Sequence, residues 1–127
     1  MTADRREAAS RHLTPRERDV LVRMVQEGVR GEPVPPSQDA EDRRRWLEQV
    51  DATRVVGTCG CGACPTIDLG VPEVRATSAA PRVVLEAGVD RALVLLFVDA
   101  DVLSYLELAP LDGTRFPEFP NAADLRF

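Results

Sequence analysis

The stretch RVVLEAGVDRALVLLFVDADVLSYLEL, residues 82–108, decides the fold. Its centre, residues 91–98, is a nearly continuous apolar run, which suits a central strand that is buried in a sheet. Strand-like segments precede and follow this run, at 82–87 and 102–108. Two short turn sequences separate the three segments, Gly-Val-Asp at 88–90 and Asp-Ala-Asp at 99–101. The stretch therefore predicts three consecutive strands that are joined by tight turns.

Two further strands are expected upstream of this stretch. Residues 54–58 have the β-branched content of a strand, and over residues 67–71 apolar residues alternate with polar or small ones. The segment between them contains all the cysteines of the chain, so we expect a hairpin to carry those thiols. Together with residues 82–108, these segments give a sheet of about five strands.

A helix is expected over residues 15–27, before the strands begin. Thr14 is placed to cap this helix, Pro15 suits its first position, and Glu17 completes a capping box with Thr14. Gly28 is a natural stop. The apolar residues of the segment recur at helical spacing and form one stripe, made of Val20, Leu21, Met24 and Val25.

A second helix is expected after a proline-rich connection. Ser37 or Asp39 can cap it, and it runs to about Val50. Its three arginines, residues 43–45, stand among acidic residues. This pattern is more typical of an ion-paired helix surface than of a nucleic-acid patch.

The order of helices followed by consecutive strands predicts an α+β fold. We expect two N-terminal helices packed on an antiparallel sheet of about five strands, followed by a Pro/Phe-rich C-terminal tail. Residues 1–12 are expected to be a flexible tail and residues 13–127 a single domain. Three aromatic rings are expected to anchor the C-terminal tail against the sheet, those of Phe116, Phe119 and Phe127.

The composition is that of a soluble globular protein, with 44% hydrophobic and 29% charged residues. The net charge of −5 argues against a phosphate-backbone ligand, and the apolar runs are too short to span a bilayer. The first ten residues lack the apolar region of a secretory signal. We therefore expect a cytoplasmic protein with no nucleic-acid or membrane partner, whose acidic second half is compatible with a basic protein partner.

The three cysteines lie within one six-residue segment and are Cys59, Cys61 and Cys64. Closely spaced cysteines favour a metal site over other functions, because soft thiolate sulfur selects zinc, copper(I) or iron–sulfur clusters. The glycines at 60 and 62 would let the backbone fold tightly enough to aim three sulfurs at one point. A structural zinc site needs four ligands, and we expect Asp68 to be the fourth, with His12 as the more distant choice.

Two alternatives to a structural metal remain open at this stage. The thiols can pack as ordinary small residues without any reactivity. They can also act in redox chemistry, since Cys61 and Cys64 have Cys-x-x-Cys spacing and Cys59 could resolve a disulfide between them. The chain shows no phosphate-binding loop, no nucleophile elbow and no histidine placed for general-base work, so a non-enzymatic role is expected.

The chain resembles a group of small, uncharacterised actinobacterial proteins. The resemblance rests on LTPRER at 13–18, VVGTCGCG at 55–62, CPTIDL at 64–69, and the pair LFV and LSYLE at 96–98 and 103–107. Ala63 looks like a one-residue insertion in the thiol loop of that pattern. The group implies no established activity. By analogy, small acidic proteins of this size and origin include immunity proteins that neutralise a toxin, which makes an acidic partner-binding protein of the immunity or antitoxin type the alternative function.

Overall fold

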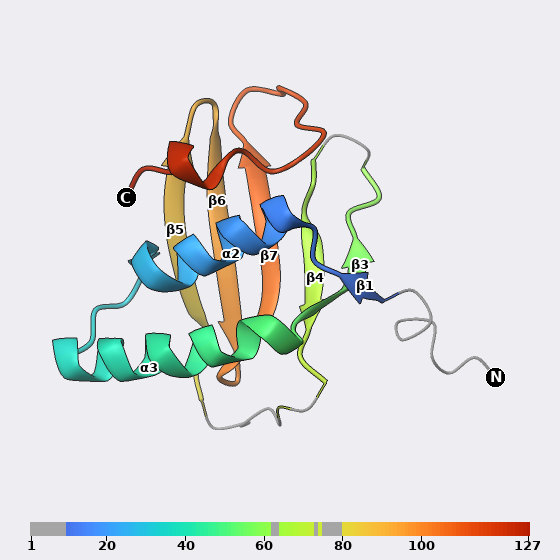
Figure 1. Ribbon diagram of the computed structural model, residues 1–127. Helices are drawn as coiled ribbons and strands as arrows, with labels where there is room; N and C mark the ends of the chain where they lie inside the picture. The colour runs from blue at the N-terminus through green and yellow to red at the C-terminus, as the bar shows by residue number, and fades with distance from the viewer. Residues whose placement is uncertain (1–9, 62–63, 73, 75–79) are drawn as a thin grey trace.

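The computed structural model describes residues 10–61, 64–72, 74 and 80–127, and its centre is a seven-stranded antiparallel sheet. The strand order is β1-β3-β4-β7-β6-β5-β2. The two α-helices lie on the same face of this sheet (Figure 1). The strands are β1 (Arg11–His12), β2 (Val29–Arg30), β3 (Arg54–Thr58), β4 (Ile67–Gly70), β5 (Val83–Val89), β6 (Ala92–Asp99) and β7 (Val102–Pro110).

The expected α+β class is confirmed, but the expected number of strands is too low. The two additional strands, β1 and β2, contain two residues each and form the two edges of the sheet. Segments this short carry no detectable period, so only their pairing partners define them. Because Arg11 and His12 pair with β3, the last two residues of the expected N-terminal tail belong to the sheet. Residues 1–9 of that expected tail lie outside the described residues.

Strands β5, β6 and β7 form the continuous meander that residues 82–108 predict. Leu96 at the centre pairs with Leu85 on one side and with Leu106 on the other. Successive side chains of β6 alternate between buried and half-buried, as expected for a strand with only one covered face. The turn between β6 and β7 has positive φ angles at Ala100 (52°) and Asp101 (68°), which match the twist of a two-residue hairpin.

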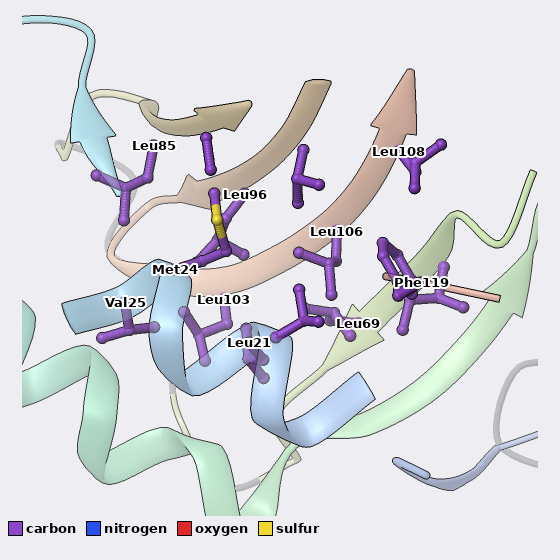
Figure 2. Close-up of a cluster of buried hydrophobic side chains, with 14 of the residues drawn as sticks. Leu21, Met24, Val25, Leu69, Leu85, Leu96, Leu103, Leu106, Leu108 and Phe119 are labelled. Carbon is purple, nitrogen blue, oxygen red and sulfur yellow. The ribbon is translucent and has the colours of Figure 1, made fainter. Parts of the chain in front are cut away.

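Helix α2 (Pro15–Glu27) covers the buried face of this meander. The capping box is present, because the Glu17 N–H donates to Thr14 Oγ1 and the Thr14 N–H donates to Glu17 Oε1. Leu21 and Met24 are fully buried and point toward the leucines of β6 and β7 (Figure 2). The helix ends at Gly28, where a Cβ atom would lie only 2.8 Å from that of Leu85. Glycine is required there because the helix end approaches β5 so closely.

Helix α3 (Pro36–Gln49) begins at least two residues earlier than expected and without a side-chain cap. Pro35 occupies the cap position, so neither Ser37 nor Asp39 caps the helix. Asp39 instead accepts hydrogen bonds from Arg30 and Arg43. The arginine run is an ion-paired helix surface, as the sequence predicts, through the pairs Arg43–Asp39, Arg44–Glu41 and Arg45–Asp42.

Asp101, in the β6–β7 turn, joins helix α3 to the sheet. Its carboxylate accepts hydrogen bonds from the Arg45 guanidinium at 2.9 Å and from the Trp46 indole at 2.8 Å. Gln49 donates to the Asp101 carbonyl and accepts from the Leu103 N–H. Burial of Asp101 opposes ionisation, but the hydrogen bonds from Arg45 and Trp46 outweigh it, and the pKa of this carboxyl is lowered.

The C-terminal segment returns over the edge of the core through a short 3-10 helix, η2 (Ala122–Asp124). Phe119 is almost fully buried, and Phe116 packs against the core, so these two rings anchor the segment as predicted. Phe127 does not, because it is 44% exposed and lies beneath the guanidinium of Arg23. The last ring therefore rests on helix α2, while the backbone of Arg126 pairs with Gly88 at the edge of β5.

The Asp101 contacts predict an ordered series of stabilities. We expect Asp101→Ala to lower the free energy of unfolding by about 2 kcal/mol, because it leaves the buried indole N–H of Trp46 without an acceptor. Asp101→Asn should cost less, since an amide oxygen still accepts that hydrogen bond and asparagine tolerates a positive φ. Urea denaturation at neutral pH measures both losses.

Acid should remove the advantage of the native carboxylate over Asp101→Asn. Because the pKa of Asp101 is lower in the folded state, its ionised carboxylate stabilises the folded protein. This stabilisation is complete at pH values above the ordinary pKa of an aspartate, and it is lost as the pH falls through the lower folded-state pKa. The difference in unfolding free energy between the two proteins should therefore shrink below that range. Equal stability of all three proteins at neutral pH would refute the role given to Asp101.

Candidate metal centre

Strands β3 and β4 form the hairpin whose loop carries the thiols, as the sequence predicts. Thr58 pairs with Ile67 at the end of the ladder, and the Cys59 N–H donates to the Thr66 carbonyl at 3.1 Å. The pairing is thus extended to the first cysteine. Because β4 also pairs with β7, the hairpin is fixed to the central meander rather than attached only through its own turn.

Thr66 anchors the return of the loop to the sheet. It is buried, and its hydroxyl oxygen accepts a hydrogen bond from the Leu108 N–H at 3.0 Å. The same hydroxyl donates to the Leu108 carbonyl at 3.4 Å. A side chain therefore continues the β4–β7 pairing beyond the last ladder residue, and this fixes where the chain leaves the loop.

The three sulfur atoms of Cys59, Cys61 and Cys64 lie within 4.8 Å of one another. The sulfurs of Cys61 and Cys64 are 3.3 Å apart, far beyond the disulfide bond length of about 2.05 Å. Zinc–sulfur bonds of about 2.3 Å place tetrahedral thiolates about 3.8 Å apart. The cluster therefore has the dimensions of a site that could hold a metal ion. Gly62, which was expected to let the loop fold tightly, and Ala63, the apparent insertion, lie outside the described residues.

The surroundings of the sulfurs differ from one cysteine to the next. Cys61 is exposed, whereas Cys59 and Cys64 are half-buried. The backbone N–H of Cys61 favours the Cys59 thiolate, but hydrogen bonds with the thiols of Cys61 and Cys64 favour the protonated form more strongly. The pKa of the Cys59 thiol is therefore raised. The neighbouring thiols therefore favour the protonated form of Cys59, and a metal ion would have to displace that proton to bind the thiolate.

Asp68 is placed near this cluster but not in it. The group of ligand atoms within 4.8 Å of one another contains the three sulfurs and not the Asp68 carboxylate. That carboxylate lies over Gly57, where a Cβ atom would be 2.6 Å from Asp68 Oδ2. His12 is exposed on β1, where it pairs with Arg54, and it is not part of the group either. The assignment of Asp68 as the fourth ligand stays a prediction.

Tyr105, a residue that sequence analysis did not select, is electrostatically coupled to the thiol loop. It lies opposite Asp68 in the β4–β7 register. Burial raises the pKa of Tyr105, and the negative charges of Glu107, Asp68, Cys59 and Cys64 raise it further. No local motif connects positions so far apart in the chain, and only the strand register brings them together.

A surface pocket of about 570 Å³ lies beside the thiol loop. Cys64 and Thr58 line it from the hairpin. Arg11 of β1, Arg16 of α2 and Phe119 of the C-terminal segment line the rest. Both arginines are already ion-paired, Arg11 with Glu17 and Arg16 with Glu118. The pocket therefore gives solvent access to Cys64 without presenting an uncompensated positive charge.

Comparisons with protein-family models, with curated proteins and with solved structures give no match to this chain. The resemblance to the actinobacterial group therefore stays a prediction. Within the described part of the chain, no helix combines the length and the apolar character that crossing a membrane requires.

The hydrogen bonds of Thr66 predict how firmly the hairpin is held. We expect Thr66→Val to lower the free energy of unfolding by about 2 kcal/mol, because it leaves the buried Leu108 N–H without an acceptor while keeping the side-chain shape. Thr66→Ser keeps the hydroxyl and is the matched control. A Thr66→Val protein that is as stable as Thr66→Ser in urea would show that this hydroxyl does not anchor the loop.

Proposed function

We propose that the protein is a small, non-enzymatic metal-binding protein, in which Cys59, Cys61 and Cys64 hold a structural zinc ion. The observation that carries the proposal is the convergence of all three sulfurs on one point at the tip of an anchored hairpin. Sulfur donors favour zinc, copper(I) or iron–sulfur clusters, and zinc is the usual choice where the ion closes a loop rather than reacts.

A zinc ion at this place would cross-link the two ends of the loop. Cys59 directly follows the end of β3, and Cys64 precedes the strand residue Ile67 by only a few positions. Coordination of both would therefore stabilise the hairpin where its backbone ladder ends. Asp68 is the proposed fourth ligand, and it would have to move from its place over Gly57 to reach the ion.

Coordination of zinc by three converging sulfurs requires reduced cysteines, and we therefore propose a cytoplasmic location, where thiols are kept reduced. The same geometry favours thiol redox chemistry as the second candidate function. Sulfurs 3.3 Å apart need only a small movement to form a Cys61–Cys64 disulfide. An oxidised small-molecule disulfide would accept the two electrons and leave as two thiols, and the bond between the two protein sulfurs would form.

Zinc binding and its loss on substitution test the main proposal. Protein purified without chelator should contain about one zinc ion per chain, and chelation should lower its melting temperature. A structural zinc site contributes about 10–16 kcal/mol over four ligands, so each Cys→Ser change at 59, 61 or 64 should weaken binding about 100- to 1000-fold. A competition assay with a coloured zinc chelator measures these affinities.

The fourth ligand is tested by Asp68→Asn, with Asp90→Asn in the exposed β5–β6 turn as the matched control. We expect weaker zinc binding in the first variant and unchanged binding in the second. Well under one metal per chain, or affinity that the cysteine substitutions leave unchanged, would overturn the metal-binding function. A chelated protein that cycles reversibly between thiol and Cys61–Cys64 disulfide would favour the redox function instead.

A further inference from the structure

The face of the sheet opposite the helices carries a second set of apolar side chains. These residues are half-buried, and none of them is part of the hydrophobic core or packed against it. Helices α2 and α3 both lie on the other side of the sheet, so neither covers this one (Figure 1). We call this set the open face, and it comprises Val84, Leu93, Leu95, Phe97, Tyr105 and Ala109.

Strand register arranges the open face in rows that cross the sheet. In one row, Leu95 lies between Glu86 and Glu107. In the next row, Phe97 pairs with Val84 and with Tyr105, and Tyr105 in turn pairs with Asp68. The Phe97 and Tyr105 rings lie 5.7 Å apart at a tilted angle of 53°. The rows thus place an apolar and aromatic centre between carboxylates.

The charges around this centre are not balanced. Arg82 lies 4.9 Å above the Phe97 ring, but its guanidinium is already held by Asp99 through bonds of 2.6 and 3.1 Å. Glu86, Glu107 and Asp68 form no ion pair with any arginine of the described residues. The open face therefore presents three uncompensated negative charges around an apolar surface.

The edges of the sheet are less suited to a partner than its face. β2 pairs with Leu85 and Glu86 on the outer side of β5, and Arg126 exchanges two hydrogen bonds of 2.8 Å with Gly88 farther along. At the other edge, β1 pairs with β3. Other segments of the same chain already bond to these backbone groups. A strand from a partner protein therefore finds few free backbone groups with which to extend the sheet.

We propose that the open face is a docking surface for a basic protein segment. Apolar side chains of that segment would contact Leu95 and Phe97, and flanking arginine or lysine residues would pair with Glu86 and Glu107. A second copy of this chain fits less well, because it would bring the same carboxylates against one another on a protein of net charge −5. The surface is independent of the metal, although a bound segment would lie beside Tyr105 and hence near the thiol loop.

A synthetic amphipathic peptide of leucine and lysine probes this surface, and its leucine–glutamate counterpart is the charge control. We expect the lysine peptide to shift backbone amide resonances of β5, β6 and β7 in two-dimensional NMR spectra, and the glutamate peptide to shift none. The double change Glu86→Arg with Glu107→Arg should weaken binding at least about tenfold, because attraction becomes repulsion.

The matched control places the same charge change on the opposite side of the molecule. Glu41→Arg with Glu48→Arg alters two exposed residues of helix α3 and should leave the affinity unchanged. Leu95→Ser should weaken binding without changing the net charge, and dispersed NMR spectra would show that each variant is folded. Cys59→Ser should bind the peptide normally, which separates this surface from the metal site.

Three results would overturn the proposal. The first is no shift in β5, β6 or β7 at millimolar lysine peptide, and the second is equal weakening by the two charge-reversed pairs. The third is a dimer in sedimentation that Leu95→Ser dissociates, because the open face would then be a contact between two copies of this chain.

Discussion

The structure depends on the burial of one sheet face beneath helix α2. Leu21 and Met24 are completely buried against the meander, and the close approach at Gly28 leaves no room for a larger residue. Each buried leucine or methionine contributes about 1.5–3 kcal/mol, so the burial of Leu21 and Met24 contributes several kcal/mol to the stability of the fold. Because strand side chains alternate, covering one face also decides which residues remain on the other.

The thiol cluster depends on the same arrangement in a less direct way. β4 pairs with β7, so the β3–β4 hairpin extends the meander, and the hydroxyl of Thr66 carries the pairing past the end of the strand. The loop therefore leaves from and returns to fixed positions. Three sulfurs converge there, and a bound ion would complete a hairpin that backbone hydrogen bonds alone leave open.

Local signals in the sequence predict much of this fold. The capping box at Thr14 and Glu17, the apolar stripe of α2 and the strands of residues 82–108 all depend on neighbouring residues, and all are present. The two-residue strands β1 and β2 could not be predicted, since their existence depends only on distant pairing partners. Helix α3 also starts without the expected cap, because it begins at Pro36 and Ser37 and Asp39 therefore lie within its first turns.

The thiol cluster, like the fold, could be predicted from the sequence only where its residues are close together in the chain. Cys59, Cys61 and Cys64 are close together in the sequence, and their sulfur atoms lie within 4.8 Å of one another. Asp68 and Tyr105 could not be placed from spacing, because the sheet register directs Asp68 over Gly57 and brings Tyr105 opposite to it. The open face is likewise invisible in the sequence, where its residues look like the rest of an apolar strand.

X-ray absorption at the zinc edge tests the central claim most directly, because it counts the atoms bound to the ion. The zinc-loaded protein should show three sulfur neighbours at about 2.3 Å and one lighter neighbour at about 2.0–2.2 Å. A first shell made only of oxygen and nitrogen, or one with fewer than three sulfurs, would contradict a metal centre formed by Cys59, Cys61 and Cys64.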